Sequence, residues 1–224
     1  MENVIKQSTF LVLGATGGTG QHFVPLALSG GHRVRTLVRT PTKLLLQDPS
    51  LQVFQGSITE ELDIDRLLDG VDIVISMLGD AAMQKSTKIN TAFVKKLVPA
   101  MRRQGVRRFL YQAGGLSRPY GGHLSPVLWT IRNTVARSFI GQHEDNEAVM
   151  QVLAEEARDI EWIVHRAGIG GNGPTKGTLE RSATKLSIAT FKDCAAYNYR
   201  TVMDTSAIHT SDFSRYERNR VSGP

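Results

Sequence analysis

Six short apolar runs, separated by polar or helical segments, dominate the first 165 residues of this chain. The first run, Ser8–Leu13, carries β-branched and apolar side chains, which is typical of a strand buried inside a parallel sheet. The others lie at about 34–38, 51–54, 71–78, 106–111 and 160–164. Because neighbouring parallel strands need a crossover, usually a helix, this alternation predicts an α/β fold: a Rossmann-type, doubly wound parallel sheet.

The rest of the chain has a weaker pattern. Glycines from Gly168 to Gly177 indicate a long connection after the sixth strand, followed by a short strand near 186–189 and a helix over about 193–203. We therefore expect residues 1–224 to form one domain. Its core is predicted at about 8–169, a small C-terminal region covering the substrate side at about 170–213, and a frayed tail at 214–224.

Composition is that of an ordinary globular protein, with 41% hydrophobic and 21% charged residues. The single cysteine, Cys194, excludes an internal disulfide and a cysteine-rich zinc site, and we predict no metal. The apolar runs are too short to span a bilayer, and Met1–Lys6 does not resemble the start of a signal peptide. We expect a cytoplasmic protein with no membrane partner.

Charge is unevenly distributed, although the formal net charge is only +6. A stretch at 95–108 is basic, and another at 144–161 is acidic except for Arg158. Basic stretches are typical of nucleic-acid surfaces, but this one closes a helical pattern and has no interleaved aromatic residues. We expect no nucleic-acid partner and a monomer or homodimer, the latter aided by two oppositely charged surfaces.

A glycine-rich turn, Gly14-Ala15-Thr16-Gly17-Gly18-Thr19-Gly20, lies between the first strand and the first helix. In this position bare backbone N–H groups at a helix N-terminus can meet a pyrophosphate, which side chains would block. No Lys-Ser or Lys-Thr follows, so the turn is not a mononucleotide P-loop. The sequence predicts dinucleotide binding; the alternative is a glycine turn without a ligand.

Arg39 and Lys43 follow the second strand, where NAD-binding proteins carry an acid for the ribose 2′-OH. A guanidinium instead pairs with a 2′-phosphate, so these residues favour NADP(H) over NAD(H). The alternative is that both are solvated surface cations.

These residues, together with Trp162–Gly168, resemble the atypical short-chain dehydrogenase/reductase families, and most of all the NmrA-like and biliverdin-reductase-B-like proteins. The resemblance extends over about residues 8–205. It implies NADP(H) bound along the carboxyl ends of the strands. The residues it assigns to the cofactor are Gly14, Thr16, Gly17, Gly18, Thr19 and Gly20 at the pyrophosphate; Arg39 and Lys43; Ser57 and Ile58 at the adenine; Met77, Leu78, Gly79, Gln112, Ala113 and Gly114 beside the ribose and nicotinamide; and Arg166, Gly168 and Ile169 on the nicotinamide side.

The chain departs from the typical members in its proton-transfer residues. Those members carry a serine and a Tyr-x-x-x-Lys pair, in which the lysine lowers the tyrosine pKa. Here no candidate tyrosine has a lysine four residues later, and Ala113-Gly114-Gly115 stands where the serine is expected. The usual aspartate near Ser57 is also absent. Carbonyl reduction by the usual mechanism is therefore not expected.

Three other residues are candidates for catalysis. His143 lies beside Glu144 and Asp145, and an imidazole there has acid/base potential; the alternative is a helix start enriched in acids. Asp80 directly follows Gly79, and its alternative role is a helix N-cap. Tyr120 lies on a glycine-containing loop that we expect near the site.

Three functions fit these features. The first is an NADPH-dependent oxidoreductase acting on a flavin, quinone or conjugated small molecule, with hydride delivery carrying the reaction. The second is an isomerase, dehydratase or cyclase of secondary metabolism that keeps NADP(H) on the same fold. The third is a non-enzymatic sensor of the dinucleotide, which the length of 224 residues disfavours, since the sensor type has a long C-terminal extension.

Overall fold

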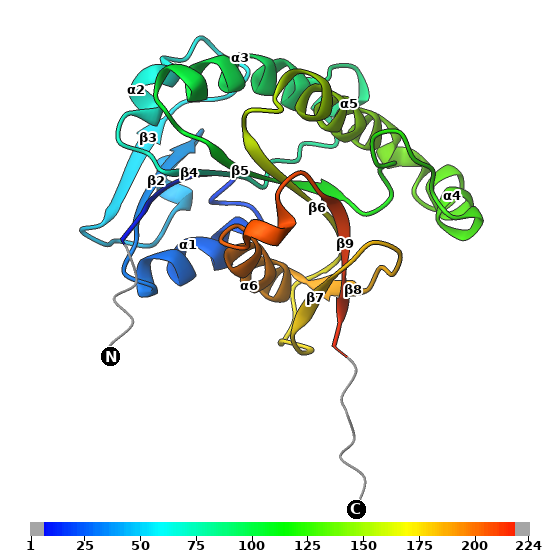
Figure 1. The fold of residues 1–224 in the computed structure, drawn as a ribbon. Helices are drawn as coiled ribbons and strands as arrows, with labels where there is room; N and C mark the ends of the chain where they lie inside the picture. Colours follow the sequence, from blue (N-terminus) through cyan, green and yellow to red (C-terminus); the bar gives the residue numbers. More distant parts are fainter. Residues whose placement is uncertain (1–6, 218–224) are drawn as a thin grey trace, which may run out of the picture.

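A sheet of nine strands runs through the molecule in the order β3-β2-β1-β4-β5-β6-β9-β7, with β8 paired to β6 (Figure 1). The computed structural model describes residues 7–217. All neighbouring strands are parallel except β7 and β9. The strands are β1 (Thr9–Leu13), β2 (Arg33–Val38), β3 (Leu51–Gln55), β4 (Ile73–Ser76), β5 (Arg108–Gly114), β6 (Glu161–Gly171), β7 (Leu179–Ser182), β8 (Ile188–Thr190) and β9 (Ser211–Tyr216).

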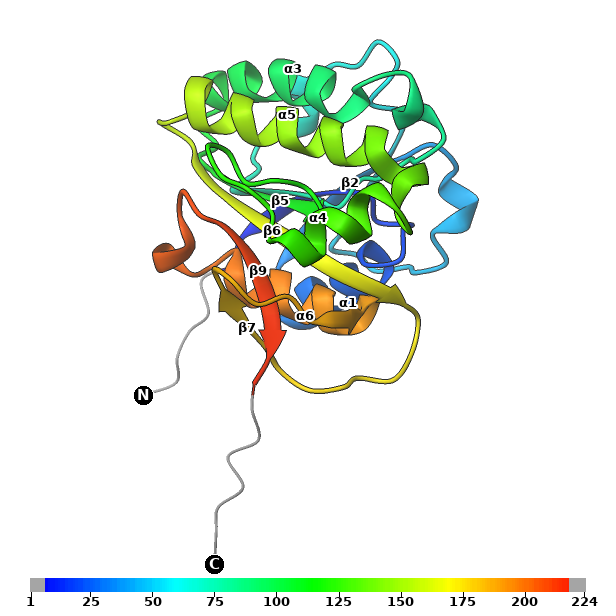
Figure 2. The same ribbon diagram turned by 90° about the vertical axis from the view of Figure 1, so that its right-hand side faces the viewer.

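Helices cover both faces of this sheet, which confirms the predicted doubly wound α/β fold (Figures 1 and 2). On one face lie α2 (Ile64–Leu68), α3 (Ile89–Arg103) and α5 (Ile140–Glu156), and on the other α1 (Gly20–Ser29) and α6 (Phe191–Thr201). The helix α4 (Pro126–Asn133) extends beyond the edge of the α5 layer (Figure 1).

Side chains alternate between two hydrophobic cores because successive residues of a strand face opposite sides of the sheet. In β1, Leu11 and Leu13 enter the core beneath α3 and α5, whereas Phe10 and Val12 enter the core beneath α1 and α6. All four are fully buried. The apolar character of both faces, visible in the sequence, is therefore what fixes β1 in the middle of the sheet.

The C-terminal region differs from its prediction. The expected strand and helix exist as β8 and α6, but β6 continues to Gly171 instead of ending where the glycines begin. The prediction of a frayed tail from 214 is wrong, since β9 pairs with β6 on one side and β7 on the other. Main-chain pairing holds this strand. The part of the predicted tail at 218–224 lies outside the described residues.

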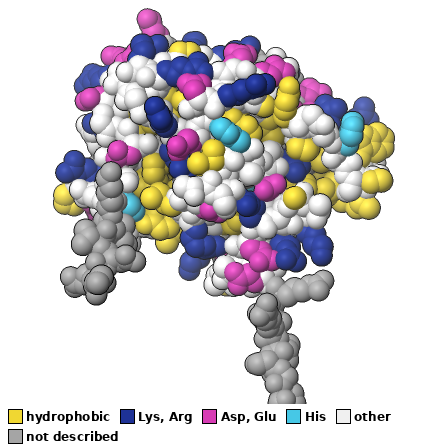
Figure 3. Space-filling view, viewed as in Figure 1, with side chains coloured by type: hydrophobic (Ala, Val, Ile, Leu, Met, Phe, Trp, Pro, Cys, Tyr) yellow, Lys and Arg dark blue, Asp and Glu magenta, His cyan; other side chains and the backbone are white. Residues whose placement is uncertain are grey.

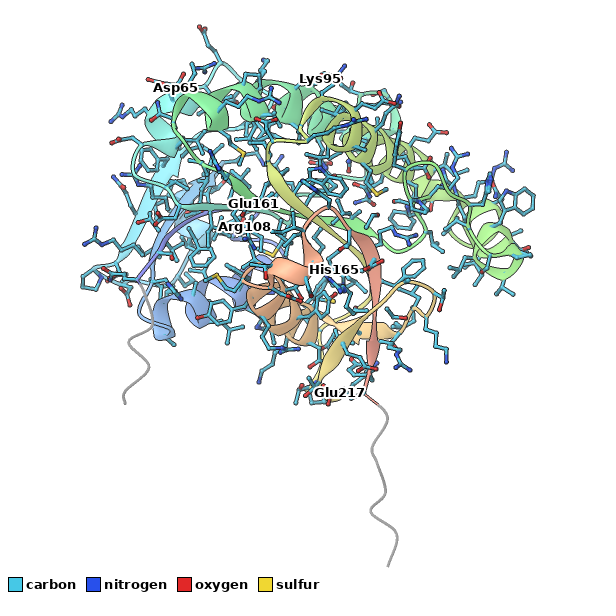
Figure 4. The ribbon with its side chains drawn as sticks, in the orientation of Figure 1. Asp65, Lys95, Arg108, Glu161, His165 and Glu217 are labelled. Atoms are coloured by element: carbon cyan, nitrogen blue, oxygen red, sulfur yellow. The ribbon has the colours of Figure 1, made fainter. Side chains whose placement is uncertain are left out.

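Three arginines of the basic stretch form ion pairs with acidic side chains, two of which belong to the acidic stretch. Arg102 pairs with Asp159 at 2.6 Å, Arg103 with Asp65 at 2.7 Å, and Arg108 with Glu161 at 2.7 Å. The last pair joins neighbouring strands β5 and β6 (Figure 4). Basic and acidic side chains are accordingly interspersed over the α2 and α3 side of the surface (Figure 3). The two stretches are therefore not separate charged surfaces, and self-association stays a prediction. In the part of the chain from 7 to 217, no helix has the length and apolar character needed to cross a membrane.

Candidate functional site

A cleft in two parts lies at the carboxyl ends of the central strands. The parts share Gly17 and Met77–Gly79, so they are continuous. The smaller part, about 140 Å³, is lined by Leu13, Gly14, Thr16, Leu37, Val38, Arg39, Gly56, Ser57, Ile58, Thr59, Asp80, Met83, Ile89 and Asn90. The larger part, about 430 Å³, is lined by Gly18, Thr19, Gln112–Leu116, Leu128, Ile131, Gln142, His143, Asn146, Ala167–Ile169, Leu186, Ile188 and Phe191.

The glycine-rich loop joins β1 to α1 at the junction of the two parts. Gly14 has a φ of +89°, and a Cβ there would lie 2.8 Å from the carbonyl oxygen of Met77. A side chain at Gly18 would collide with the ring of Phe191. Gly17 is different, because a Cβ would meet only the carbonyl oxygen of Gly14, at 3.2 Å. The fold therefore requires Gly14 and Gly18, whereas a Cβ at Gly17 would make one tight main-chain contact and would otherwise face the cleft, which Gly17 lines in both parts.

The N-terminus of α1 suits an anion. Its first turn contains no acidic residue, and the side chain of the N-cap residue Thr19 does not cap the helix. Instead, Thr19 Oγ1 accepts a hydrogen bond from Gln112 Nε2 at 3.1 Å. A helix N-terminus without a carboxylate carries partial positive charge from its free N–H groups.

At the far end of the smaller part, Arg39 Nη1 lies 3.4 Å from Asp80 Oδ2. The Arg39 side chain is 68% exposed, so it is accessible from the cleft. Asp80 also accepts a hydrogen bond from the amide of Met83 at 3.1 Å, as the first residue of a turn. The structure thus places Asp80 beside Arg39 and in the lining of the smaller part only. Its alternative, a helix N-cap, is not observed either, since the N-cap of the short 3-10 helix that follows is Ala82. Lys43 lies on a short 3-10 helix (Pro41–Lys43) and is not among the described residues that line the cleft.

Most residues predicted at the nicotinamide side do line the larger part, but its apolar walls come from residues that no motif marked. Leu128 and Ile131 belong to α4. Leu186 precedes β8, Ile188 is the first residue of β8, and Phe191 is the first residue of α6. These are apolar residues in ordinary helix and strand patterns, so only the tertiary structure distinguishes them. The outer surface of α4 is also apolar, with hydrophobic side chains gathered at that end of the molecule (Figure 3).

His143 is the predicted catalytic residue that lies in the larger part. It is only 6% exposed. Burial lowers the pKa of His143 to about 4, with Arg132 acting in the same direction and Glu147 opposing it. The imidazole is therefore neutral near pH 7. Its Nε2 is buried and has no hydrogen-bond partner among the described residues.

Asp145, two residues after His143, has a structural role. The sequence indicated only that acidic residues are enriched at the start of this helix. Its buried carboxylate accepts hydrogen bonds from the amides of Asn90 and Thr91, at 3.0 and 2.9 Å, and from Gln84 Nε2 at 2.7 Å. Asn90 and Thr91 lie in the first turn of α3, so Asp145 caps the N-terminus of another helix. It thereby fixes the segment that carries Gln84 and Asn90 beside the cleft.

Two predicted residues lie elsewhere. Tyr120 is 52% exposed and donates a hydrogen bond to Glu155 at 3.0 Å; among the described residues it lines a separate surface groove with Trp162 and His209. Arg166 is correctly placed near the end of β6, but its side chain turns toward β9. The guanidinium lies 3.8 Å from the centre of the Phe213 ring and donates to the carbonyl of Ser211 at 3.0 Å. It therefore braces β9 and does not line the described cleft.

This fold, with a glycine loop leading into an α-helix N-terminus at the carboxyl ends of parallel strands, defines a protein of the dinucleotide-binding Rossmann class. A family model described as NAD(P)H-binding matches residues 14–204. The chain belongs to this NAD(P)H-binding family of atypical short-chain dehydrogenases/reductases.

Among curated proteins, the chain is 30% identical over 188 residues to a 3 beta-hydroxysteroid dehydrogenase/Delta 5-->4-isomerase from Mycobacterium tuberculosis, covering 73% of this chain and 47% of that protein. It is 30% identical over 132 residues to an isoflavone reductase homolog from Zea mays, covering 54% of this chain and 40% of that protein. The chain spans about half the length, or less, of these relatives.

Solved structures share the fold at low identity. An anaerobillin reductase from Escherichia coli O157:H7 aligns with a TM-score of 0.72 and 17% identity, covering 95% of this chain and 98% of that one. An oxidoreductase from Lactococcus lactis aligns with a TM-score of 0.73 and 13% identity, covering 94% and 91%. At these identities the likeness shows the fold alone.

Proposed function

We propose that this protein is an NADPH-dependent oxidoreductase that exchanges hydride with a flat, conjugated small molecule such as a quinone or flavin. The observation that carries the proposal is the continuity of the glycine loop with an apolar cavity of about 430 Å³. The relatives described above are named for steroid, isoflavonoid and bilin chemistry, and all of these are ring-based compounds. A cavity walled by leucine, isoleucine and phenylalanine suits such a shape.

The residues present fit the cofactor. Gly17 lines both parts of the cleft without a side chain, where a pyrophosphate would approach, and α1 presents its N-terminus without an acid. Ser57 and Ile58 line the smaller part, where they would flank the adenine, and Arg39 would pair with the 2′-phosphate. When bound, NADPH supplies the hydride.

The chain itself contributes position and exclusion of water. His143 is the one titratable side chain among the described residues that line the larger part, and neither a tyrosine nor a lysine stands there. Because His143 is neutral and buried, it lacks the proton reserve of a Tyr-Lys pair. We therefore assign rate enhancement mainly to holding the acceptor against the cofactor, with the proton for the product coming from solvent.

The test is stoichiometric NADPH oxidation with 2-methyl-1,4-naphthoquinone (menadione) and with flavin mononucleotide, using NADPH deuterated at C4. Loss of one NADPH per acceptor reduced, slowed by deuterium in single turnover, is the expected result. Product formed without net loss of NADPH would instead support the isomerase, dehydratase or cyclase alternative. Tight NADPH binding with no turnover of any acceptor would support the sensor alternative.

A further inference from the structure

A group of exposed apolar side chains covers α4 and the turn that follows it. We call this group the α4 patch; its members, between 38% and 86% exposed, are Val127, Trp129, Ile131, Val135 and Phe139. They gather at the end of the molecule where α4 extends beyond α5 (Figures 1 and 3). Globular proteins rarely leave such a group in water, and an exposed apolar patch marks a surface that meets a partner.

Polar contacts, and not the burial of apolar side chains, hold α4 in place. Ser125 caps the helix with its side chain, and Pro126 occupies the first turn. The buried guanidinium of Arg132 pairs with Glu147 of α5 and donates to the carbonyl oxygen of Leu116 at 3.2 Å. The helix is thus anchored through one polar side chain, and its apolar residues stay exposed.

The charges around the α4 patch favour an anionic partner. No aspartate or glutamate occurs between Asp80 and Glu144, a stretch that contains the whole patch. Arg137 belongs to the patch segment, and Lys85 lies beside it, since its Cα is 3.0 Å from the place that a Cβ on Gly141 would take. Both cations are exposed, and neither forms an ion pair with another residue that the structure describes.

Two carboxylates at the start of α5 do not cancel this charge. Glu147 pairs with both Arg118 and Arg132. The pKa of Arg118 is raised by its hydrogen bond to Glu147 and, to a smaller extent, by Glu144. These two acids therefore face two arginines of their own, and the two exposed cations remain in excess. A second copy of this chain, docked on the α4 patch about a twofold axis, would bring those cations against their counterparts.

The α4 patch is continuous with the larger part of the cleft. Ile131 belongs to both, because it lines the cavity and is 38% exposed. Ile188 of β8 also lines the cavity and is 57% exposed. The cavity therefore opens beside the patch, and the surface that leads into it is apolar.

We propose that the α4 patch docks this protein on the surface of a lipid bilayer that carries anionic headgroups. Aromatic side chains settle at the level of the headgroups, the aliphatic ones enter the boundary of the acyl chains, and Lys85 and Arg137 lie against the phosphates. An apolar ligand then reaches the cavity from the bilayer without crossing water. The expectation of no membrane partner concerned spanning segments, which docking on a surface does not need.

Flotation with lipid vesicles tests the contact in the wild-type protein. We expect binding to vesicles of phosphatidylcholine mixed with phosphatidylglycerol, and binding about tenfold weaker or more with phosphatidylcholine alone, because the two cations then lose their anionic partners. The fluorescence of Trp129 should shift to the blue on binding. Trp162, the other tryptophan of the chain, is buried and should not respond.

Substitutions test which residues make the contact. Trp129→Ser should weaken binding to the mixed vesicles about tenfold or more, whereas Trp129→Phe should bind almost normally and lack the blue shift. Leu45→Ser is the matched control, since Leu45 is 91% exposed outside the patch, and it should bind as the wild type does. Arg137→Glu should weaken binding about tenfold, and Arg33→Glu, the same charge change on an exposed residue of β2, should weaken it far less.

No wild-type binding to the mixed vesicles, equal binding to the two compositions, or equal losses in Trp129→Ser and Leu45→Ser would overturn the proposal. A dimer in light scattering that Trp129→Ser dissociates, without vesicle binding, would overturn it in favour of a second copy. Circular dichroism and NADP⁺ affinity should be unchanged in these variants, whose substituted residues are exposed. Because no acceptor or turnover enters these measurements, failure of the proposed function would leave vesicle binding intact and only NADPH consumption absent.

Discussion

Replacing Arg39 by alanine should abolish the preference for NADPH over NADH that we propose for this protein. A charge-assisted pair with the 2′-phosphate contributes about 1.5–3 kcal/mol. In the structure, however, Arg39 pairs with Asp80 at 3.4 Å, and both side chains are partly exposed. Such a surface pair is worth at most about 1 kcal/mol, and the phosphate must displace it.

The net preference is therefore about 0.5–3 kcal/mol, or about 2- to 150-fold in the ratio of the two dissociation constants. Arg39→Ala should remove this ratio by weakening NADPH alone, because NADH carries no phosphate at that position. Asp80→Asn keeps the acceptor for the Met83 amide and removes the competing charge. It should strengthen NADPH binding by up to about fivefold.

Calorimetric titration of both nucleotides measures these changes. Arg33→Ala is the matched control, since Arg33 is an exposed cation at the opposite end of the same strand. It should leave both affinities unchanged. Equal weakening of NADH and NADPH in Arg39→Ala, or an unchanged ratio, would refute the assignment of Arg39 to the 2′-phosphate.

Four further outcomes are expected. Gly17→Ala should weaken NADPH binding by about tenfold or more and lower thermal stability only modestly, because the added Cβ meets a single main-chain atom, the Gly14 carbonyl oxygen at 3.2 Å, and otherwise points into the cleft; normal binding by a well-folded variant would contradict this. Asp145→Ala should cost about 3–5 kcal/mol of unfolding free energy and lower Tm by about 6–20 °C, because its hydrogen bonds to α3 and Gln84 are lost; a cost below about 1 kcal/mol would count against the capping role. Burial lowers the pKa of His165 to about 4, so His165 of the unfolded chain takes up a proton first as the pH falls below about 6.5. The free energy of unfolding should therefore fall by about 1.4 kcal/mol per pH unit between pH 6.5 and pH 4. Urea unfolding at pH 6 and 4.5 should show a smaller fall in His165→Gln, and an equal fall in both proteins would argue against a neutral buried imidazole. Tyr120→Phe should keep turnover within about twofold, since its hydroxyl bonds to Glu155 outside the cleft, and a loss beyond tenfold would place it in the reaction.

The sequence was sufficient to predict the parallel core and to select many of the residues that line the cleft, although Lys43 and Arg166 lie outside it. Strands such as Thr9–Leu13 are apolar on both faces, and the glycine loop has a local pattern that the pyrophosphate itself demands. Both are local signals, in which neighbouring residues determine the result.

The substrate half depends on contacts between distant residues, which leave no local signal. Strand β9 has the polar sequence Ser-Asp-Phe-Ser-Arg-Tyr and was predicted as a tail, because main-chain pairing with β6 and β7 and not an apolar pattern holds it. The place of Asn146 in the cleft lining was missed for a similar reason. Asn146 and its partner Ser117 are ordinary polar residues in the sequence, and only the fold brings them within hydrogen-bond distance across 29 residues of chain.

The placement of β9 beside β6 has a consequence for the order in which the nascent chain can complete its parts. His165 and Arg166 on β6 have partners in Ser214 and Ser211, which are 49 and 45 residues further along the chain (Figure 4 labels His165). At 5–20 residues per second, a ribosome needs about 2–10 s to add that length. During this interval the first four parallel strands and the glycine loop can already assemble, while β6 still exposes a histidine and an arginine that later become buried. The nucleotide half of the cleft can therefore be complete for seconds before the substrate half exists, and nucleotide captured at that stage would stabilise the partly synthesised chain.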